Sequence, residues 1–496
     1  MSGTINPRNN PDLPDGDIPF VPRVINPIKI RLVVLFSAEE AVRASQKIIQ
    51  DEIPWADVQV YGNPLSVSEI RFDGGMVIIM DDIALNLVDT DKIRRNNPNV
   101  VIVLLSFQRL VQSSPPAVAL KEYPYTAKAD LIFAANRVEF APKKIVASVV
   151  RAAEDHLNIE KCSDNRRFIL LIVDDEPSWP SQFLPILYNI IGQRAGVKII
   201  RTYEDALRFM FGVDDESLIR DEYREIGSGD QVVCLITDIF FPKAGRIDSE
   251  AGRSLIRLTN KYYVRIPIII ASKAAEAKEF AGAGFVLPKG DPGSLDTLRT
   301  YIRDLTGIGD FVIQDERGRE LYRLKDIRDM CRLLSWAGGD GPRAKQLRSI
   351  LEIYGERDMF STWFYMHSLR ELGDKLRPQR YRGKQLIAEL EVSLKQELRR
   401  MRHIPLVIGE TRVFDLDGLL KTLKDAAPEV IAPLSDDDII SSWLDSRGYS
   451  ELAEALRPIH GKGTQLRAVI TGIIEEWIRI YENRVDHTPG LADSVT

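Results

Sequence analysis

The stretch FILLIVDD, residues 168–175, places six apolar side chains directly before two adjacent aspartates, Asp174 and Asp175. An aliphatic run without polar alternation is typical of a strand that is buried on both faces of a parallel sheet. Two neighbouring carboxylates repel each other, so a fold keeps such a pair where water or another charge compensates it. The stretch therefore predicts a buried parallel strand with a candidate cation site at its carboxyl end.

Further apolar runs, separated by amphipathic stretches, surround this strand. Their spacing predicts a five-stranded parallel sheet with right-handed crossovers over residues 167–308. A similar series predicts a first domain at 28–158 that ends in a helix over 141–157, with a polar linker at 159–166. The expected fold class is therefore α/β, with two doubly wound five-stranded domains. The runs are IRLVVLFS (30–37), VQVYG (58–62), MVIIMDD (76–82), VVIVLLSF (100–107) and ADLIFAANR (129–137) in the first domain, and VKIIRT (197–202), QVVCLITD (231–238), IPIIIAS (266–272) and AGFVLPKG (283–290) in the second.

Polar side chains end three other strands of the second domain. Asp238 ends the third strand, Ser272 the fourth and Lys289 the fifth. Because the carboxyl ends of parallel strands meet at one edge, we expect these side chains beside Asp174 and Asp175. Mg²⁺ keeps several waters, so Asp174, Asp175 and Asp238 suffice as its protein ligands. A metal, a carboxylate nucleophile, a hydroxyl and a lysine together suit phosphoryl transfer onto Asp238.

This order of residues resembles the receiver domains of bacterial two-component response regulators. The resemblance implies a flavodoxin-like domain in which Asp238 is the phosphoacceptor and binds Mg²⁺ together with Asp174 and Asp175. It also implies that Ser272 is the switch hydroxyl and that Lys289 pairs with the phosphate.

Two positions near the lysine depart from the family pattern. The aromatic switch residue usually lies three positions before the lysine, whereas Phe285 lies four before it and Val286 takes its place. The proline that usually follows the lysine instead precedes it, as Pro288. These departures affect the expected output switch more than the phosphorylation chemistry.

A tandem repeat follows the second domain. The segment FSTWFYMHSLRELGDKLRPQRYRGKQL (360–386) aligns without a gap to ISSWLDSRGYSELAEALRPIHGKGTQL (440–466). Upstream, a hairpin is expected to turn on Gly318, and each repeat is predicted to contain a small strand pair and helices. We therefore expect two mainly helical modules, 309–402 and 403–484, stacked as neighbours.

Matched residues of the repeats have mainly structural interpretations. Trp363 and Trp443 occupy equivalent positions and are expected to be core anchors. The glycine of HGKGTQL recurs in both repeats, which favours a turn between helices over a phosphate loop. The five histidines of the chain show no metal-ligand spacing.

A narrower resemblance covers about 167–390. Here the chain is similar to the regulatory front end of certain bacterial proteins in which a receiver precedes a pyruvate/phosphoenolpyruvate-binding domain of the pyruvate, phosphate dikinase type. No dikinase nucleotide-binding or phosphohistidine segment is recognisable in the sequence. The sequence therefore predicts a phosphoacceptor regulatory protein and not an enzyme.

The first α/β domain lacks most of these site residues. Asp81 or Asp82 ends its third strand and Ser106 its fourth, but its first strand ends in FSAEE and its fifth in AANR. Without an acid pair and a lysine, a metal and a phosphoryl group would be poorly held. We interpret this domain as a pseudo-receiver that serves packing or dimerisation, with Asp81 as a structural residue.

Composition limits the remaining possibilities. Charged residues make up 28% and the formal net charge is −6, so nothing attracts the chain generally to nucleic acid or anionic membranes. No apolar run approaches the length of a membrane span. Three separated cysteines, without a CxxC pair, indicate a reducing compartment, and we predict a cytoplasmic protein. Segments 1–27 and 485–496 are expected to be disordered.

Together these patterns predict a phosphorelay response regulator. Its expected partners are a histidine kinase or phosphotransfer protein as phosphoryl donor, a downstream protein and a possible second copy of the chain. A non-enzymatic scaffold with vestigial receivers is the alternative. DNA-binding transcription control is disfavoured, because charges nearly balance over 311–485 and no helix-turn-helix pattern stands out.

Overall fold

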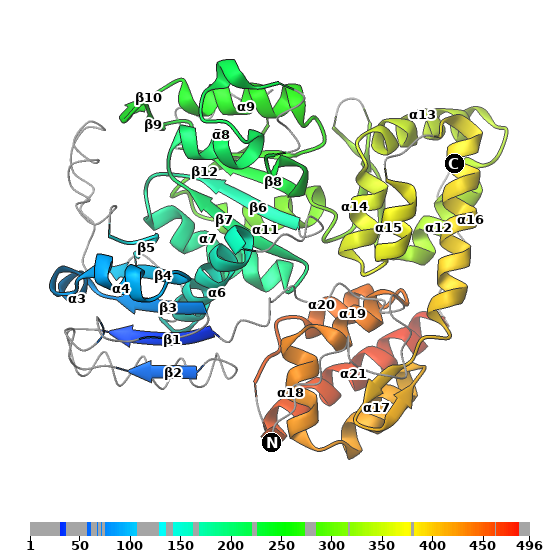
Figure 1. Cartoon of the computed structure of the whole chain (residues 1–496). Coiled ribbons are helices and arrows are strands. Elements are labelled where there is room, and N and C mark those ends of the chain that lie inside the picture. Colours follow the sequence, from blue (N-terminus) through cyan, green and yellow to red (C-terminus); the bar gives the residue numbers. More distant parts are fainter. Residues whose placement is uncertain are drawn as a thin grey trace. The chain divides into compact units, whose positions relative to one another are not determined.

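The computed structural model of the chain describes residues 30–35, 57–60, 67, 71, 75–106, 128–134, 142–161, 168–220, 226–272, 284–315, 318–377, 381–461 and 463–485 (Figure 1). Two compact units divide the chain between Thr306 and Gly307. The predicted arm 1–27, and all but the first residue of the predicted tail 485–496, lie outside the described residues. Among the residues that are described, no helix combines the length and the apolar composition needed to cross a membrane.

The first unit contains two parallel five-stranded sheets, so the predicted α/β class is confirmed. In each sheet the first strand in sequence lies between the second and the third, and the fourth and fifth strands follow the third. The order of the first sheet is β2-β1-β3-β4-β5, and that of the second is β12-β11-β8-β6-β7. The strands are β1 (Ile30–Leu35), β2 (Asp57–Val60), β3 (Gly75–Met80), β4 (Val100–Ser106) and β5 (Leu131–Ala134), then β6 (Phe168–Val173), β7 (Ala195–Ile200), β8 (Val232–Thr237), β11 (Ile268–Ser272) and β12 (Phe285–Pro288).

In the described residues, helices lie between β3 and β4, between β5 and β6, and in each connection from β6 to β11, as expected for parallel neighbours. The helix predicted over 141–157 continues to Lys161, so the first three residues of the predicted linker 159–166 are helical. A short hairpin that the sequence analysis did not predict follows β8, and its turn is formed by Ala244 and Gly245, both with positive φ. The elements are α3 (Asp82–Leu87), α4 (Thr90–Asn96), α6 (Pro142–Lys161), α7 (Ser178–Ile191), α8 (Tyr203–Phe211), β9 (Phe241–Lys243), β10 (Arg246–Asp248), α9 (Ala251–Tyr262) and α11 (Ser294–Leu305).

Helix α7 is buried on nearly all sides. Every residue of SWPSQFLPILYNII except Gln182 and Asn189 is buried, and a helix that is apolar all round needs neighbours on every face. Helices α6 and α11 and strands β5 and β7 supply those neighbours. On α6, Asp155 accepts hydrogen bonds from the Tyr188 hydroxyl at 2.9 Å and from the Val197 amide of β7 at 2.8 Å. Helix α6 therefore joins the two sheet domains within one unit.

The second unit consists of two similar modules. In the described residues each module has an antiparallel strand pair followed by five helices, as the repeat predicts. Gly318 and Gly409 turn the two hairpins with φ of 75° and 60°. The first module contains β13 (Phe311–Gln314), β14 (Glu320–Leu324), α12 (Ile327–Ala337), α13 (Pro342–Glu356), α14 (Met359–Met366), α15 (Arg370–Leu376) and α16 (Gly383–Met401). The second contains β15 (Leu406–Ile408), β16 (Thr411–Val413), α17 (Leu416–Asp425), α18 (Pro428–Asp436), α19 (Ile439–Asp445), α20 (Ser450–Leu456) and α21 (Gly463–Val485).

The modules also share local geometry. Asp358 and Asp438 precede α14 and α19 with φ of 53° and 56°, an unusual conformation for a residue other than glycine. Trp363 and Trp443 are fully buried in the cores of their modules, which confirms their role as core anchors. The Trp363 indole donates to the Gly309 carbonyl at 3.0 Å.

A buried histidine connects the two modules. His367 of the first module lies 2.7 Å from Asp445 Oδ1 of the second, and its other ring nitrogen lies 3.0 Å from the Gly309 carbonyl. The same carboxylate accepts from the Ser450 hydroxyl at 2.7 Å and pairs with Arg457 at 2.9 Å. All of these side chains are buried, so the junction between the modules is polar and extensively hydrogen-bonded.

Candidate functional site

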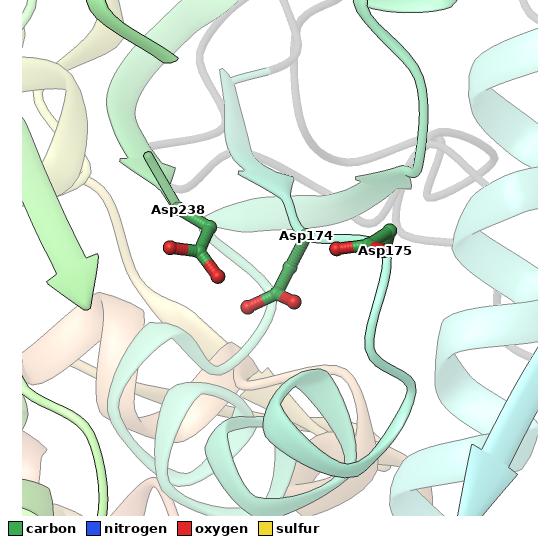
Figure 2. Close-up of side chains that lie close together, drawn as sticks. All are labelled: Asp174, Asp175 and Asp238. Carbon is green, nitrogen blue, oxygen red and sulfur yellow. The ribbon is translucent and has the colours of Figure 1, made fainter. Parts of the chain in front are cut away.

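Strand pairing brings the three candidate aspartates together. β6 and β8 are central neighbours, and their last residues, Val173 and Thr237, face each other in register. The Asp238 amide donates to the Val173 carbonyl at 2.9 Å. Asp174 and Asp175 leave the end of β6 as Asp238 leaves the end of β8, and the three carboxylates lie close together (Figure 2).

Lys289 reaches the same edge from β12. Its ammonium lies 2.7 Å from Asp174 Oδ2 and 2.5 Å from Asp238 Oδ2, and its side chain is only 2% exposed. Ser272 and Pro288 pair at the ends of β11 and β12, and the Lys289 amide donates to the Ser272 carbonyl at 2.8 Å. Ser272 is itself buried at the end of its strand. All five predicted residues therefore lie at the carboxyl edge of one sheet.

The acidic cluster has the donor set of a hard divalent cation. One oxygen from each of Asp174, Asp175 and Asp238 lies within 4.8 Å of the others, and no second group of this kind occurs among the described residues. Two ligands of one Mg²⁺ lie at most about 4.2 Å apart, since each bond is about 2.1 Å. Small rotations of the carboxyl groups would bring the oxygens from within 4.8 Å of one another to the separation that one Mg²⁺ requires. The residues present therefore fit a magnesium ion.

The local charge also favours a cation. Three carboxylates face one ammonium, Lys289, and the Arg201 guanidinium also attracts Asp175. Burial raises the pKa of Asp174 to about 7; repulsion from Asp238 adds to the rise and attraction to Lys289 opposes it. Burial, with Asp238, also raises the pKa of Asp175 to about 6. Burial alone would lower the pKa of Lys289, but attraction by Asp174 and Asp238 raises it instead, so we take Lys289 as charged. Three carboxylates therefore outnumber the two cations that act on them at this edge.

Backbone groups hold the carboxylates in place. Asp174 Oδ1 accepts from the Glu176 amide at 3.0 Å, and Asp238 Oδ1 accepts from the Ile239 amide at 2.6 Å. Gly252, at the start of α9, lies against the end of β8: an added Cβ would lie 2.5 Å from the Asp238 carbonyl oxygen. Any other residue at position 252 would displace the strand end that carries Asp238.

Sequence reasoning missed a second set of side chains around the lysine. The Trp179 ring lies 5.4 Å from the Lys289 ammonium, measured to the ring centroid. Its indole nitrogen donates to Glu176 Oε2 at 2.9 Å, and the Ser178 hydroxyl donates to Glu176 Oε1 at 2.6 Å. In the sequence, Trp179 is marked only by its place in the DDEPSW segment, shortly after the aspartates. Its contact with Lys289 depends on how α7 packs, which the sequence pattern does not specify.

Phe285 and Asp81 make contacts outside the acidic cluster. Phe285 on β12 is about one third exposed and contacts the Tyr301 ring at 5.3 Å. In the first sheet domain, Asp81 caps α3 by accepting from the Ala84 amide at 2.8 Å, as expected for a structural residue. The side chains of Asp82 and Ser106 lie outside the described residues.

Comparisons with known proteins add little. No family model matches the chain, and no curated protein matches it. Two solved structures show weak likeness. Tagatose-6-phosphate ketose/aldose isomerase from Escherichia coli has 8% identity over 55% of this chain and 79% of its own, with a TM-score of 0.20. A putative sugar binding protein from Salmonella typhimurium LT2 has 8% identity over 55% of this chain and 86% of its own, with a TM-score of 0.17. These scores are too low to support an argument.

Proposed function

We propose that residues 167–308 form a receiver domain and that the protein is a response regulator of a phosphorelay system. One observation carries the proposal: the Lys289 ammonium bridges Asp174 and Asp238, 2.7 and 2.5 Å away, at the edge where Ser272 also ends its strand. The sheet order, with the first strand between the second and third, supports it because flavodoxin-like domains share that order.

The chemistry assigns one role to each side chain. An Asp238 carboxylate oxygen attacks the phosphorus of the donor, so an oxygen–phosphorus bond forms while the bond to the leaving group breaks and its electron pair departs with that group. Lys289 then moves from the carboxylates to the new phosphoryl oxygens. The Ser272 hydroxyl donates a hydrogen bond to a phosphoryl oxygen. Asp174, Asp175 and Asp238 would hold Mg²⁺, which would supply positive charge to the phosphoryl oxygens.

The signal would pass through a change in contacts. Movement of Lys289 and Ser272 alters the face formed by β11 and β12. To transmit a signal, that change must shift an existing equilibrium between two conformations by a few kcal/mol. Such a shift changes the ratio of the two populations by about one to two orders of magnitude. A histidine kinase or phosphotransfer protein is the proposed donor, and the modules at 309–484, or a second copy of the chain, are the proposed recipients.

Phosphorylation by a small donor tests this function. Incubation with acetyl phosphate and Mg²⁺ is expected to add one phosphoryl group, visible by intact mass spectrometry, and no group should be added when Mg²⁺ is chelated before the donor is supplied. Asp238→Asn keeps the size of the side chain but removes the nucleophile, so the adduct should be absent from this variant. A wild-type chain that stays unmodified, or an Asp238→Asn variant modified to the same extent as the wild type, would refute the assignment.

The alternative is a scaffold in which the cluster is vestigial. The shifted positions of Phe285 and Pro288 favour this alternative, because they alter the region expected to carry the output. A scaffold would show no phosphorylation under the conditions above, so the same measurement separates the two functions.

A further inference from the structure

The Lys289 ammonium is enclosed by two carboxylates and one aromatic face. Asp174 and Asp238 take two of its contacts, and the Trp179 ring is the third described neighbour, 5.4 Å away. A cation within about 6 Å of an indole centroid is attracted by the ring, most strongly where water is excluded. Both partners meet that condition, since Trp179 is 7% exposed and the lysine side chain 2%.

The position of Trp179 is fixed independently of the lysine. Its indole nitrogen donates to Glu176 Oε2, and Glu176 is held in turn by the Ser178 hydroxyl. The ring also lies beside Gly290, where an added Cβ would be 3.7 Å from the Trp179 ring. Gly290 has a φ of 84°, so the chain turns sharply directly after Lys289 and passes against the indole. The ring therefore supports both the ammonium and the backbone that carries it.

From these contacts we propose that Trp179 is a positioning residue that holds Lys289 for the phosphoryl group on Asp238. This inference rests on the proposed phosphoacceptor function. When the lysine leaves the carboxylates for the phosphoryl oxygens, the indole keeps its charge desolvated and limits its range of positions. A desolvated cation attracts the phosphoryl oxygens more strongly than a hydrated one. Trp179 acts through Lys289 and does not itself contact the reacting atoms.

Three variants of the full chain separate the ring face from apolar bulk. Trp179→Leu removes the aromatic face and should weaken binding of beryllofluoride, a phosphoryl mimic, in saturating Mg²⁺ by about three- to tenfold. This is less than the full value of a desolvated cation–π contact, because the ring faces the lysine before the mimic binds as well. Trp179→Phe lacks the indole nitrogen but keeps a ring, so it should recover at least half of the loss. Phe183→Leu, a buried change on the same helix, should bind like the wild type.

Titration with Mg²⁺ alone distinguishes positioning from general damage. Trp179→Leu is expected to change Mg²⁺ affinity less than about twofold, because the carboxylates keep their backbone hydrogen bonds. A purely structural role would lower both affinities together. If Trp179→Leu does not fold, Trp179→Met, whose unbranched side chain adapts better to an irregular gap, replaces it in both titrations.

Beryllofluoride binding by the wild type tests the proposed function separately from the positioning role of Trp179. A wild-type chain that binds no beryllofluoride with Mg²⁺ refutes the proposed function. A wild-type chain that binds it, with Trp179→Leu binding equally well or Trp179→Phe no better than Trp179→Leu, refutes the positioning role alone.

Discussion

Replacing Lys289 with Met is expected to destabilise the second sheet domain by about 3–5 kcal/mol in magnesium-free buffer. Methionine keeps the length of the side chain but removes the ammonium that bridges Asp174 and Asp238. Breaking a buried ion pair from one side leaves uncompensated charge, and that loss accounts for the magnitude. Protection of the β6 and β8 amides against hydrogen exchange measures it, because exchange reports the opening of one region within a chain of several units.

Magnesium should reverse much of this loss. In the wild type an incoming cation shares Asp174 and Asp238 with Lys289, whereas in the Met variant the carboxylates are free for it. A ligand present at about 100 times its dissociation constant stabilises by about 2.7 kcal/mol. The gain in protection on adding Mg²⁺ is therefore expected to be larger in the variant than in the wild type.

A second lysine of the same domain provides the control. Lys243 lies 3.9 Å from Glu216 and is about a quarter exposed, so Lys243→Met should cost at most about 1 kcal/mol. An unchanged stability of Lys289→Met without Mg²⁺ would show that the ion pairs of Lys289 contribute little to stability. An equal response of both lysine variants to Mg²⁺ would show that Lys289 does not compete with the metal, and no response in either would show that the acidic cluster is not a cation site.

The site residues could be predicted because parallel strands end at one edge. Hydrophobic runs located the strands, and once they were placed, the residues directly after β6, β8 and β12 had to lie at the same edge of the sheet. The contact between Trp179 and Lys289 could not be found in this way. It depends on the position of α7 against the sheet and on side-chain rotamers, neither of which a pattern of apolar residues specifies. The β9–β10 hairpin was missed because its strands are only three residues long.

The repeats show the same limit more sharply. Arg377 and Arg457 follow equivalent helices within the same Leu-Arg-Pro triplet, and the triplet itself gives no reason to distinguish them. In the structure Arg457 is fully buried, whereas Arg377 is about a quarter exposed. The difference comes from a residue twelve positions earlier: where the second module has Asp445, the first has Tyr365, whose hydroxyl donates to Asp374.

Replacing Arg457 with Met should destabilise the second module by about 3–5 kcal/mol. Its guanidinium pairs with Asp445 and Glu454, each at 2.9 Å, and lies 3.5 Å from Asp438. Burial acts to lower the pKa of Arg457, but attraction by these carboxylates raises it, so the group stays charged and offsets their repulsion. Without it, buried negative charge is left unpaired. Hydrogen exchange of the α19 and α20 amides measures the loss.

The first module supplies the matched control. Arg377→Met removes a cation at the equivalent position, but its contact with Asp358 is 3.8 Å long and partly exposed, so the expected cost is below about 1 kcal/mol. Equal costs at the two positions would mean that burial of the Arg457 cluster does not determine its energy.

A second substitution tests the electrostatic explanation directly. Adding Asp445→Asn to Arg457→Met removes one of the unpaired charges, so the double variant should be more stable than the single one even though it has lost another ionic group. Asp445→Asn also affects the first module, because His367 of that module is hydrogen-bonded to the Asp445 carboxylate. The asparagine introduced by Asp445→Asn can still accept one hydrogen bond from the histidine, so protection of α14 should fall less than protection of α19. If the double variant is instead less stable than Arg457→Met, the hydrogen bonds of Asp445 to His367 and Ser450 outweigh the relief of its unpaired charge, and the electrostatic explanation is wrong.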